Sequence, residues 1–110
     1  MSTDPEFLAY VCAQVAGAGQ ISSRRMFGEA ALYCDGKVVG LVCGNQLFLK
    51  PTDGARALLS EAEMAPPYPG AKPHLLPDAE LDDNDLMQQV VRVICAELPA
   101  PKPKKPKSKR

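Results

Sequence analysis

The hydrophobic pattern at the start of the chain is that of a helix. Thr3 and Glu6 have the spacing of a capping box, and Pro5 is tolerated in a first turn because its missing N–H would have no partner there. Gly17 interrupts the pattern. We therefore predict a helix over residues 4–16. Its apolar positions recur at intervals of three and four residues: Phe7, Leu8, Val11, Cys12 and Val15.

Three apolar runs follow, and two-residue turn signals separate them. The runs cover residues 29–34, 37–43 and 46–50, with Asp35-Gly36 and Gly44-Asn45 between them. These pairs favour tight hairpin turns because such residues adopt a positive φ at little cost. The pattern predicts a three-stranded antiparallel meander.

Both faces of this meander are predicted to be apolar. The turns imply a register with Leu32 opposite Val39 and Leu41 opposite Phe48. An antiparallel sheet with one solvated face should alternate apolar and polar residues. Either helices and loops cover both faces, or another subunit covers one of them, and we expect a homodimer through an apolar sheet face. One predicted face carries Ala30, Leu32, Cys34, Val39, Leu41, Cys43 and Phe48, and the other carries Ala31, Tyr33, Val38, Gly40, Val42, Leu47 and Leu49.

A short second helix and an extended segment are predicted next. Thr52, after Pro51, is a suitable N-cap residue. Residues 64–77 are rich in proline and glycine, which indicates an extended chain with a short strand over residues 72–76 and room for another near 64–68. A proline cannot donate to a strand ladder, so the short strand should lie near a sheet edge. The apolar stripe of the helix is Ala55, Leu58, Leu59 and Ala62.

The last predicted helix begins within residues 82–85, Asp-Asp-Asn-Asp, whose negative charges suit the positive end of a helix dipole. It ends before Pro99. The predicted order is α-β-β-β-α-β-α, which describes an α+β domain over residues 1–98 with helices packed on an antiparallel sheet. The apolar face of this helix is Leu86, Met87, Val90, Val91, Ile94, Cys95 and Leu98.

Charge divides the chain into two parts. Residues 99–110 contain six of the thirteen basic residues and no acidic one, so the remaining seven basic and thirteen acidic residues give residues 1–98 a net charge of −6. We expect a disordered tail, because alternating Pro and Lys can form neither a helix nor a core. The tail either binds nucleic acid weakly, since no aromatic is present to stack on bases, or keeps the domain soluble. Its cations are Lys102, Lys104, Lys105, Lys107, Lys109 and Arg110.

Cysteine usage and hydropathy favour a cytoplasmic protein. The chain has no signal-peptide core and no run of about 18 apolar residues, so we expect no membrane association. His74 has no nucleophile at a motif spacing. The cysteines lack the close pairs typical of a zinc site, and we expect buried free thiols, with no metal and no cofactor. They are Cys12, Cys34, Cys43 and Cys95.

Four stretches carry a family resemblance. They are Arg25-Met26-Phe27-Gly28, Leu32-Tyr33 with the following Asp35-Gly36, Leu47-Phe48-Leu49-Lys50, and Pro67-Tyr68-Pro69-Gly70-Ala71-Lys72. Together they resemble the N-terminal domain of the TfoX/Sxy family of competence-associated proteins, over about residues 7–107. After Gly28 the chain has Glu-Ala-Ala where relatives often have another small or aromatic residue and a glycine.

The resemblance implies both a fold and a role. It implies an α+β fold akin to that of type III secretion chaperones, and an association with natural transformation in members that carry a second, C-terminal domain. We expect this chain to be a stand-alone N-terminal domain. The family has no established catalytic residues in this domain, so none is assigned. We expect a non-enzymatic role in protein–protein contact, in competence or transcription regulation.

Five residues are candidates for binding a ligand. Arg24 and Arg25, with Lys50 at the end of a strand, could bind a small anion, because guanidinium groups bind phosphate and carboxylate bidentately. Alternatively, one arginine packs over the apolar edge and pairs with an acid. Tyr68 and Lys72 could line a groove in the Pro-rich loop. Alternatively, that loop is a rigid turn that holds Tyr68 on the core.

Overall fold

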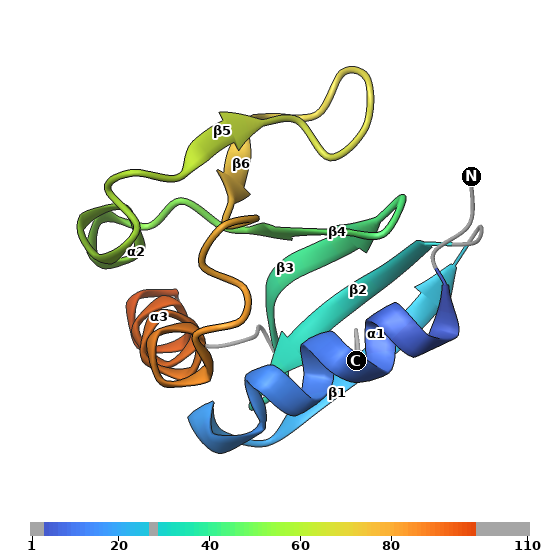
Figure 1. Ribbon diagram of the computed structural model, residues 1–110, viewed down its shortest axis with the longest axis horizontal. Helices are drawn as coiled ribbons and strands as arrows, with labels where there is room; N and C mark the ends of the chain where they lie inside the picture. The colour runs from blue at the N-terminus through green and yellow to red at the C-terminus, as the bar shows by residue number, and fades with distance from the viewer. Residues whose placement is uncertain (1–3, 27–28, 99–110) are drawn as a thin grey trace, which may run out of the picture.

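The structure is a computed structural model that describes residues 4–26 and 29–98. This part of the chain forms helices packed on a six-stranded antiparallel sheet with the strand order β1-β2-β3-β4-β6-β5 (Figure 1). The helices are α1 (Pro5–Gln14), α2 (Asp53–Leu58) and α3 (Asn84–Glu97), and a 3₁₀ turn, η1 (Ala16–Ala18), follows α1. The strands are β1 (Ile21–Met26), β2 (Glu29–Cys34), β3 (Lys37–Cys43), β4 (Gln46–Leu49), β5 (Glu63–Ala65) and β6 (His74–Leu76).

The predicted α+β class and the predicted order of elements are confirmed. The structure adds one strand at each edge of the sheet: β1, which was not predicted, and β5, which lies in the region left open for a further strand. Thr3, the Phe27-Gly28 part of the family motif and the basic tail over residues 99–110 lie outside the described residues. The N-cap of the first helix is Asp4 and not the predicted Thr3.

Both predicted hairpin turns are present. Asp35 and Gly36 have φ values of 54° and 84°, and Gly44 and Asn45 have values of 57° and 61°. Two successive positive φ angles are what a two-residue type I′ turn requires. The turns therefore join β2 to β3 and β3 to β4 as the sequence predicted.

In the first hairpin Cys34 lies opposite Lys37, as predicted, but the predicted register fails farther from the turn. Leu32 lies opposite Gly40 and not Val39, because the register shifts by a β-bulge between Leu32 and Tyr33. The extra residue of a bulge moves the following side chains to the other face of the sheet. In the second hairpin Leu41 lies opposite Phe48, as predicted.

The bulge decides which side chains reach the core. Two rows across the central strands belong to the hydrophobic core: Ala30, Val42 and Leu47 form one, and Leu32, Gly40 and Leu49 form the next. The row of Ala31, Leu41 and Phe48 lies on the opposite face, because successive strand residues alternate. The predicted pairing of Leu32 with Leu41 and Phe48 on one face was therefore wrong.

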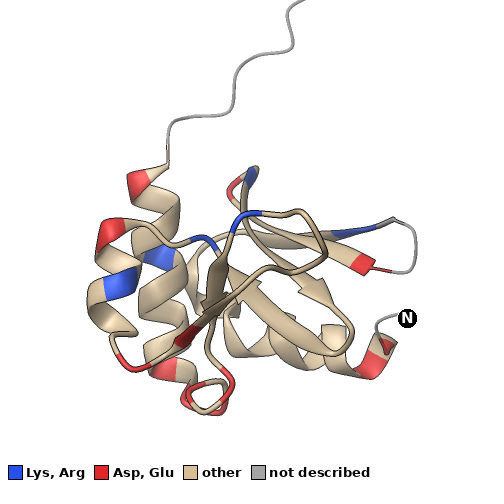
Figure 2. Ribbon diagram, turned by 90° about the horizontal axis from the view of Figure 1, so that it is seen from above, with Lys and Arg blue, Asp and Glu red and all other residues tan. Residues whose placement is uncertain are grey.

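The helices pack on one face of the sheet, as Figures 1 and 2 show. Burying an aliphatic side chain in such a core contributes roughly 1.5–3 kcal/mol each. The described helices contain none that is long and apolar enough to cross a membrane. The core residues that are fully buried include Val11, Val15, Leu32, Val39, Val42, Leu49, Leu59, Met87, Val90, Val91 and Ile94.

Side-chain caps begin each helix. The Asp4 carboxylate accepts a hydrogen bond from the Glu6 N–H at 3.0 Å, so Asp4 is the N-cap of α1. Thr52 caps α2, as predicted, by accepting from the Ala55 N–H at 3.3 Å. Asp83 caps α3. These acceptors satisfy N–H groups that have no partner within the helix.

Candidate functional site

The sheet face that the helices leave uncovered carries apolar side chains, and we call it the helix-free face. In its central row Ala31 and Phe48 are 3% and 4% exposed, whereas Leu41 is only half-buried. Tyr33 and Val38, which pair across β2 and β3, are also half-buried. Apolar surface on this face thus remains in contact with solvent.

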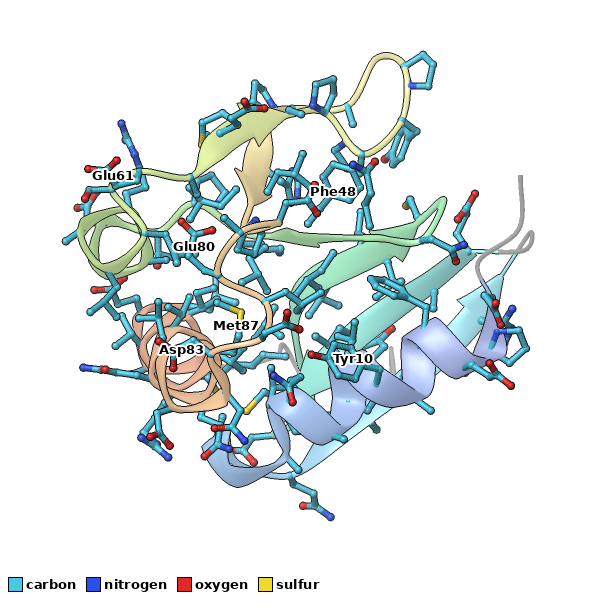
Figure 3. The ribbon with its side chains drawn as sticks, viewed as in Figure 1. Tyr10, Phe48, Glu61, Glu80, Asp83 and Met87 are labelled. Carbon is cyan, nitrogen blue, oxygen red and sulfur yellow. The ribbon has the colours of Figure 1, made fainter. Side chains whose placement is uncertain are left out.

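The connection between β5 and β6 accounts for part of the burial on this side of the molecule. Figure 3 shows Phe48 on β4 beside this connection, and Pro67 within the connection is buried. The chain therefore covers Phe48, while Tyr33, Val38 and Leu41 remain half-buried. The predicted alternative, in which the chain's own helices and loops cover both faces of the sheet, therefore holds for only part of this face.

The strands place the three candidate anion-binding residues apart. Arg24 pairs with Ala31 and so belongs to the helix-free face, whereas Arg25 pairs with Ala30 and belongs to the face with the helices. Lys50 follows β4, three strands away from β1 in the sheet order. The fold does not bring these side chains into one cluster.

Arg24 contributes instead to a shallow pocket. The pocket has a volume of about 260 Å³ and is lined by Ser22, Ser23, Arg24 and Tyr33. Ser22 and Arg24 pair with Tyr33 and Ala31, so their side chains share the helix-free face with the phenol ring, whereas Ser23 pairs with Leu32 on the opposite face. Such a surface offers hydrogen-bond donors to a carboxylate or a carbonyl group of a partner.

The Pro-rich loop forms the predicted rigid turn but does not hold Tyr68 on the core. The Ala71 N–H donates to the Tyr68 carbonyl oxygen at 3.1 Å, and Gly70 has a φ of 88°, as a type II turn requires. Tyr68 is 56% exposed. The prediction for this side chain was wrong because Pro67 is the buried residue of the loop. Lys72 is exposed.

Two thiols and a carboxylate meet where the β2–β3 turn contacts α3, and we call them the thiol cluster: Cys34, Asp35 and Cys95. Their ligand atoms lie within 4.8 Å of one another. The Cys95 thiol donates to the Cys34 carbonyl oxygen at 3.4 Å. Burial, followed by hydrogen bonding with Cys95, raises the pKa of Cys34 to about 12.

No sequence spacing indicates this cluster, because Cys34 and Cys95 are 61 residues apart. All four cysteines are free thiols, as predicted. Cys34, Cys43 and Cys95 are buried, and Cys12 is half-buried. Proximity of two cysteines follows from the packing of α3 against the end of β2, which local patterns do not reveal.

A second shallow pocket is acidic. It has a volume of about 210 Å³, and four carboxylates line it: Glu61, Glu63, Asp78 and Glu80. Figure 3 shows Glu61 beside α2 and Glu80 in the connection between β6 and α3. The pocket concentrates part of the negative charge of residues 1–98 on one side of the domain.

Comparison with known proteins relates the chain to a family and to a protein of similar length. The family model of the TfoX N-terminal domain matches residues 13–96. A protein of Spirochaeta aurantia, described as an uncharacterized 12.7 kDa protein in the trpE 5′ region, is 44% identical over 109 residues, which are 99% of this chain and 95% of that protein. Both matches include the helix-free face and the thiol cluster.

Proposed function

The chain belongs to the TfoX N-terminal domain family, and from this membership we propose that it is a non-enzymatic cytoplasmic domain that acts through protein–protein contact. Its partner on the helix-free face is a second copy of the chain. The resemblance to competence-associated proteins supports a role in competence or transcription regulation. The observation that carries the proposal is the half-buried apolar group of Tyr33, Val38 and Leu41.

A contact at this face is supported by its composition, because apolar side chains stand where a solvated face would have polar ones. A solvated sheet face normally carries polar side chains at every second position. Here the outward positions of β2 and β3 include Ala31, Tyr33, Val38 and Leu41. Removing their remaining surface from water stabilises a complex by about 25 cal/mol per Å² of apolar area, before the cost of association.

The charged side chains of the edge strand β1 favour a dimer in which two copies meet at their helix-free faces and not through pairing of their β1 strands. Arg24 and Arg25 are adjacent on β1, and both are exposed. Charged side chains on an edge strand disfavour pairing with the same strand of another copy, because like charges would face each other. The homodimer is therefore assigned to the helix-free face.

Charge supports a second copy as the partner. Residues 1–98 have a net charge of −6, and residues 99–110 carry six basic residues and no acidic one. The tail of one copy is thus complementary in charge to the domain of another. Such complementarity increases the rate of encounter and weakens as salt is added.

The titration behaviour of the cysteines supports a non-enzymatic role. Burial raises the pKa of Cys12, Cys34 and Cys43. The thiolate is the reactive nucleophile, and a thiol with a raised pKa remains protonated at neutral pH. None of these three thiols is therefore activated for covalent catalysis.

The test of the contact face is the variant Val38→Glu. Val38 is half-buried, so the domain can accommodate a carboxylate that extends to solvent, whereas an apolar interface cannot. Sedimentation velocity over a range of protein concentrations should show a dimer for the unmodified chain and a monomer for the variant.

The control is Ala57→Glu, which places the same charge on an exposed position of α2. This variant should sediment as a dimer. Circular dichroism checks that both variants are folded. A folded Val38→Glu chain that dimerises as tightly as Ala57→Glu would show that the helix-free face is not the interface.

A second candidate function is nucleic-acid association through the tail over residues 99–110. The observation in its favour is the run of six basic residues without an acidic residue. Contacts of this kind are made to phosphates and carry little sequence information. A third candidate, binding of a small anion near Arg24, rests on the 260 Å³ pocket and would appear as a thermal shift with phosphorylated metabolites.

A further inference from the structure

We propose that the thiol cluster is a binding site for a thiophilic divalent metal ion of the Zn²⁺ class, held by Cys34, Asp35 and Cys95. The proposal is independent of the contact face. Within residues 4–26 and 29–98, these are the metal-ligating side chains that come together in a group of three, with their donor atoms within 4.8 Å of one another. The spacing of the cysteines in the sequence predicted no metal, but the fold joins ligands that lie far apart along the chain.

The separations within the cluster suit a tetrahedral ion. Zinc binds sulfur at about 2.3 Å and carboxylate oxygen at about 2.1 Å, so tetrahedral geometry needs donor atoms about 3.6–3.8 Å apart. The Cys95 Sγ and the Asp35 Oδ2 are 3.9 Å apart. Small side-chain rotations bring the three donors to the separations that the ion requires.

The backbone holds the Asp35 carboxylate in a ligating orientation. The Gln20 N–H donates to Asp35 Oδ1 at 2.8 Å, and the Asp35 N–H donates to the Gln20 carbonyl oxygen at 2.9 Å. The second carboxylate oxygen, Oδ2, is the one that approaches the Cys95 thiol. Fixing one oxygen of a ligand by an outer hydrogen bond is how proteins orient metal-binding carboxylates.

Two cations, Lys37 and Arg92, act on the residues that carry the cluster. The Lys37 ammonium donates to the Cys95 and Leu98 carbonyl oxygens at 2.7 and 3.1 Å, which fixes the end of α3 against the β2–β3 hairpin. The positive charge of Arg92 lowers the pKa of Cys34, against the larger effect of burial. The thiol protons leave when a metal ion binds, because the thiolate is the ligand.

Gly19 leaves open the space beside two of the ligands. A Cβ atom at this position would lie 2.8 Å from the Cys34 Sγ and 3.1 and 3.2 Å from the two Asp35 carboxylate oxygens. Any side chain there would collide with the ligand atoms. Because Asp35 is exposed, an ion can reach the cluster from solvent, and a water molecule can complete its coordination.

The donor set selects the class of metal. Thiolates favour soft or borderline ions such as Zn²⁺, whereas Mg²⁺ and Ca²⁺ require sets of oxygen ligands. Two thiolates and one carboxylate also leave a fourth position open, as in zinc sites that bind water or an external ligand. We therefore assign Zn²⁺ and its analogues Co²⁺ and Cd²⁺ to the site, and exclude the alkaline earth ions.

Titration of the reduced full chain with Co²⁺ tests the site. Tetrahedral cobalt with thiolate ligands gives a charge-transfer band in the near ultraviolet and intense visible bands. The unmodified chain should show these bands with one ion per chain, and added Zn²⁺ should abolish them. Cys34→Ser and Cys95→Ser should each lose the charge-transfer band in part or entirely, and Asp35→Asn should weaken binding about tenfold or more.

Two other thiols of the same chain supply matched controls. Cys12→Ser and Cys43→Ser should titrate as the unmodified chain does, because neither residue belongs to the cluster. Gly19→Ala should weaken binding although no ligand is changed. Circular dichroism of each variant establishes that it is folded before titration.

A second readout does not depend on variants that fold. Native mass spectrometry of the reduced unmodified chain should show one bound Zn²⁺ ion per chain. The proposal is overturned if the reduced unmodified chain gives no thiolate–cobalt band. It is also overturned if the band persists at full intensity in a chain that carries both Cys34→Ser and Cys95→Ser.

Discussion

At Gly40, in the middle of β3, the sheet has no room for a side chain. A Cβ atom there would collide with the Phe48 carbonyl oxygen and would lie 3.0 Å from Leu49 Cδ2. The colliding atom belongs to the backbone of β4 and cannot turn away. We predict that Gly40→Ala lowers the free energy of unfolding by about 1–3 kcal/mol, as measured by urea denaturation.

Gly17 is the matched control for this prediction. A Cβ atom at Gly17 would meet the end of the Gln88 side chain, which is flexible and can move aside. Gly17→Ala should therefore change the free energy of unfolding by less than about 1 kcal/mol. Equal stability of the two variants would contradict the tight approach of β3 and β4 at Gly40.

The cysteines and the two arginines show which features of a site can be predicted from the sequence. The four cysteines were correctly predicted to be free thiols, because each lies in an apolar stretch without a close partner. The meeting of Cys34 with Cys95 could not be predicted, since it depends on where α3 ends against the β2–β3 turn. Likewise, Arg24 and Arg25 are neighbours in sequence, but the alternation of a strand separates them.

At the scale of elements, α1 is tied to the connection that precedes α3. The Tyr10 hydroxyl donates to the Asp82 carboxylate, and the Gln14 side chain donates to the Leu81 carbonyl oxygen at 2.8 Å. Figure 3 shows Tyr10 on α1. These bonds join the first helix to the connection before the last one, which is far from it in the sequence.

This link predicts a pH-dependent contribution to stability. The hydrogen bond to Asp82 raises the pKa of Tyr10 above its usual value of 10.0. A raised pKa in the folded state means that the contribution is fully present below about pH 10 and is lost as the pH rises through the folded pKa. Tyr10→Phe should therefore lower the stability at neutral pH, and the difference from the unmodified chain should shrink above pH 10.

Urea unfolding of both chains at a series of pH values measures this difference. Tyr68→Phe provides the control, because Tyr68 is 56% exposed in the β5–β6 connection and its removal should leave stability unchanged. A difference between Tyr10→Phe and the unmodified chain that stays constant from neutral to strongly alkaline pH would rule out the Tyr10–Asp82 link as its source.

Local patterns in the sequence were enough to predict most of the helices and strands. The helices and both hairpin turns follow from capping residues, apolar periodicity and residues that accept positive φ. β1 was missed because Ile-Ser-Ser-Arg-Arg-Met lacks apolar alternation, and an edge strand with exposed side chains does not need it. The β-bulge between Leu32 and Tyr33 has no sequence signal of its own, so the composition of the helix-free face was predicted only in part.

At the scale of the whole molecule, charge is unevenly distributed. The connection between β6 and α3 carries Asp78, Glu80, Asp82 and Asp83, and acidic positions follow it in Figure 2. With the pocket of Glu61 and Glu63, it gives residues 1–98 an acidic side. The six basic residues after Pro99 oppose this charge.

If the tail binds nucleic acid, deleting residues 99–110 should abolish the binding of duplex DNA at low salt. The unmodified chain should then lose affinity as salt rises, with a log–log slope of at most about −0.9 for each cation that contacts a phosphate. Fluorescence anisotropy with labelled DNA measures both effects. Unchanged DNA binding after the deletion would eliminate the tail as the nucleic-acid site.

The central claim is that the helix-free face joins two copies of the chain. Light scattering of the unmodified full chain during size-exclusion chromatography tests it most directly, because it measures mass independently of shape. We predict a mass of about twice the 11.8 kDa of one chain. A single species with the mass of one chain, at every concentration examined, would contradict the claim.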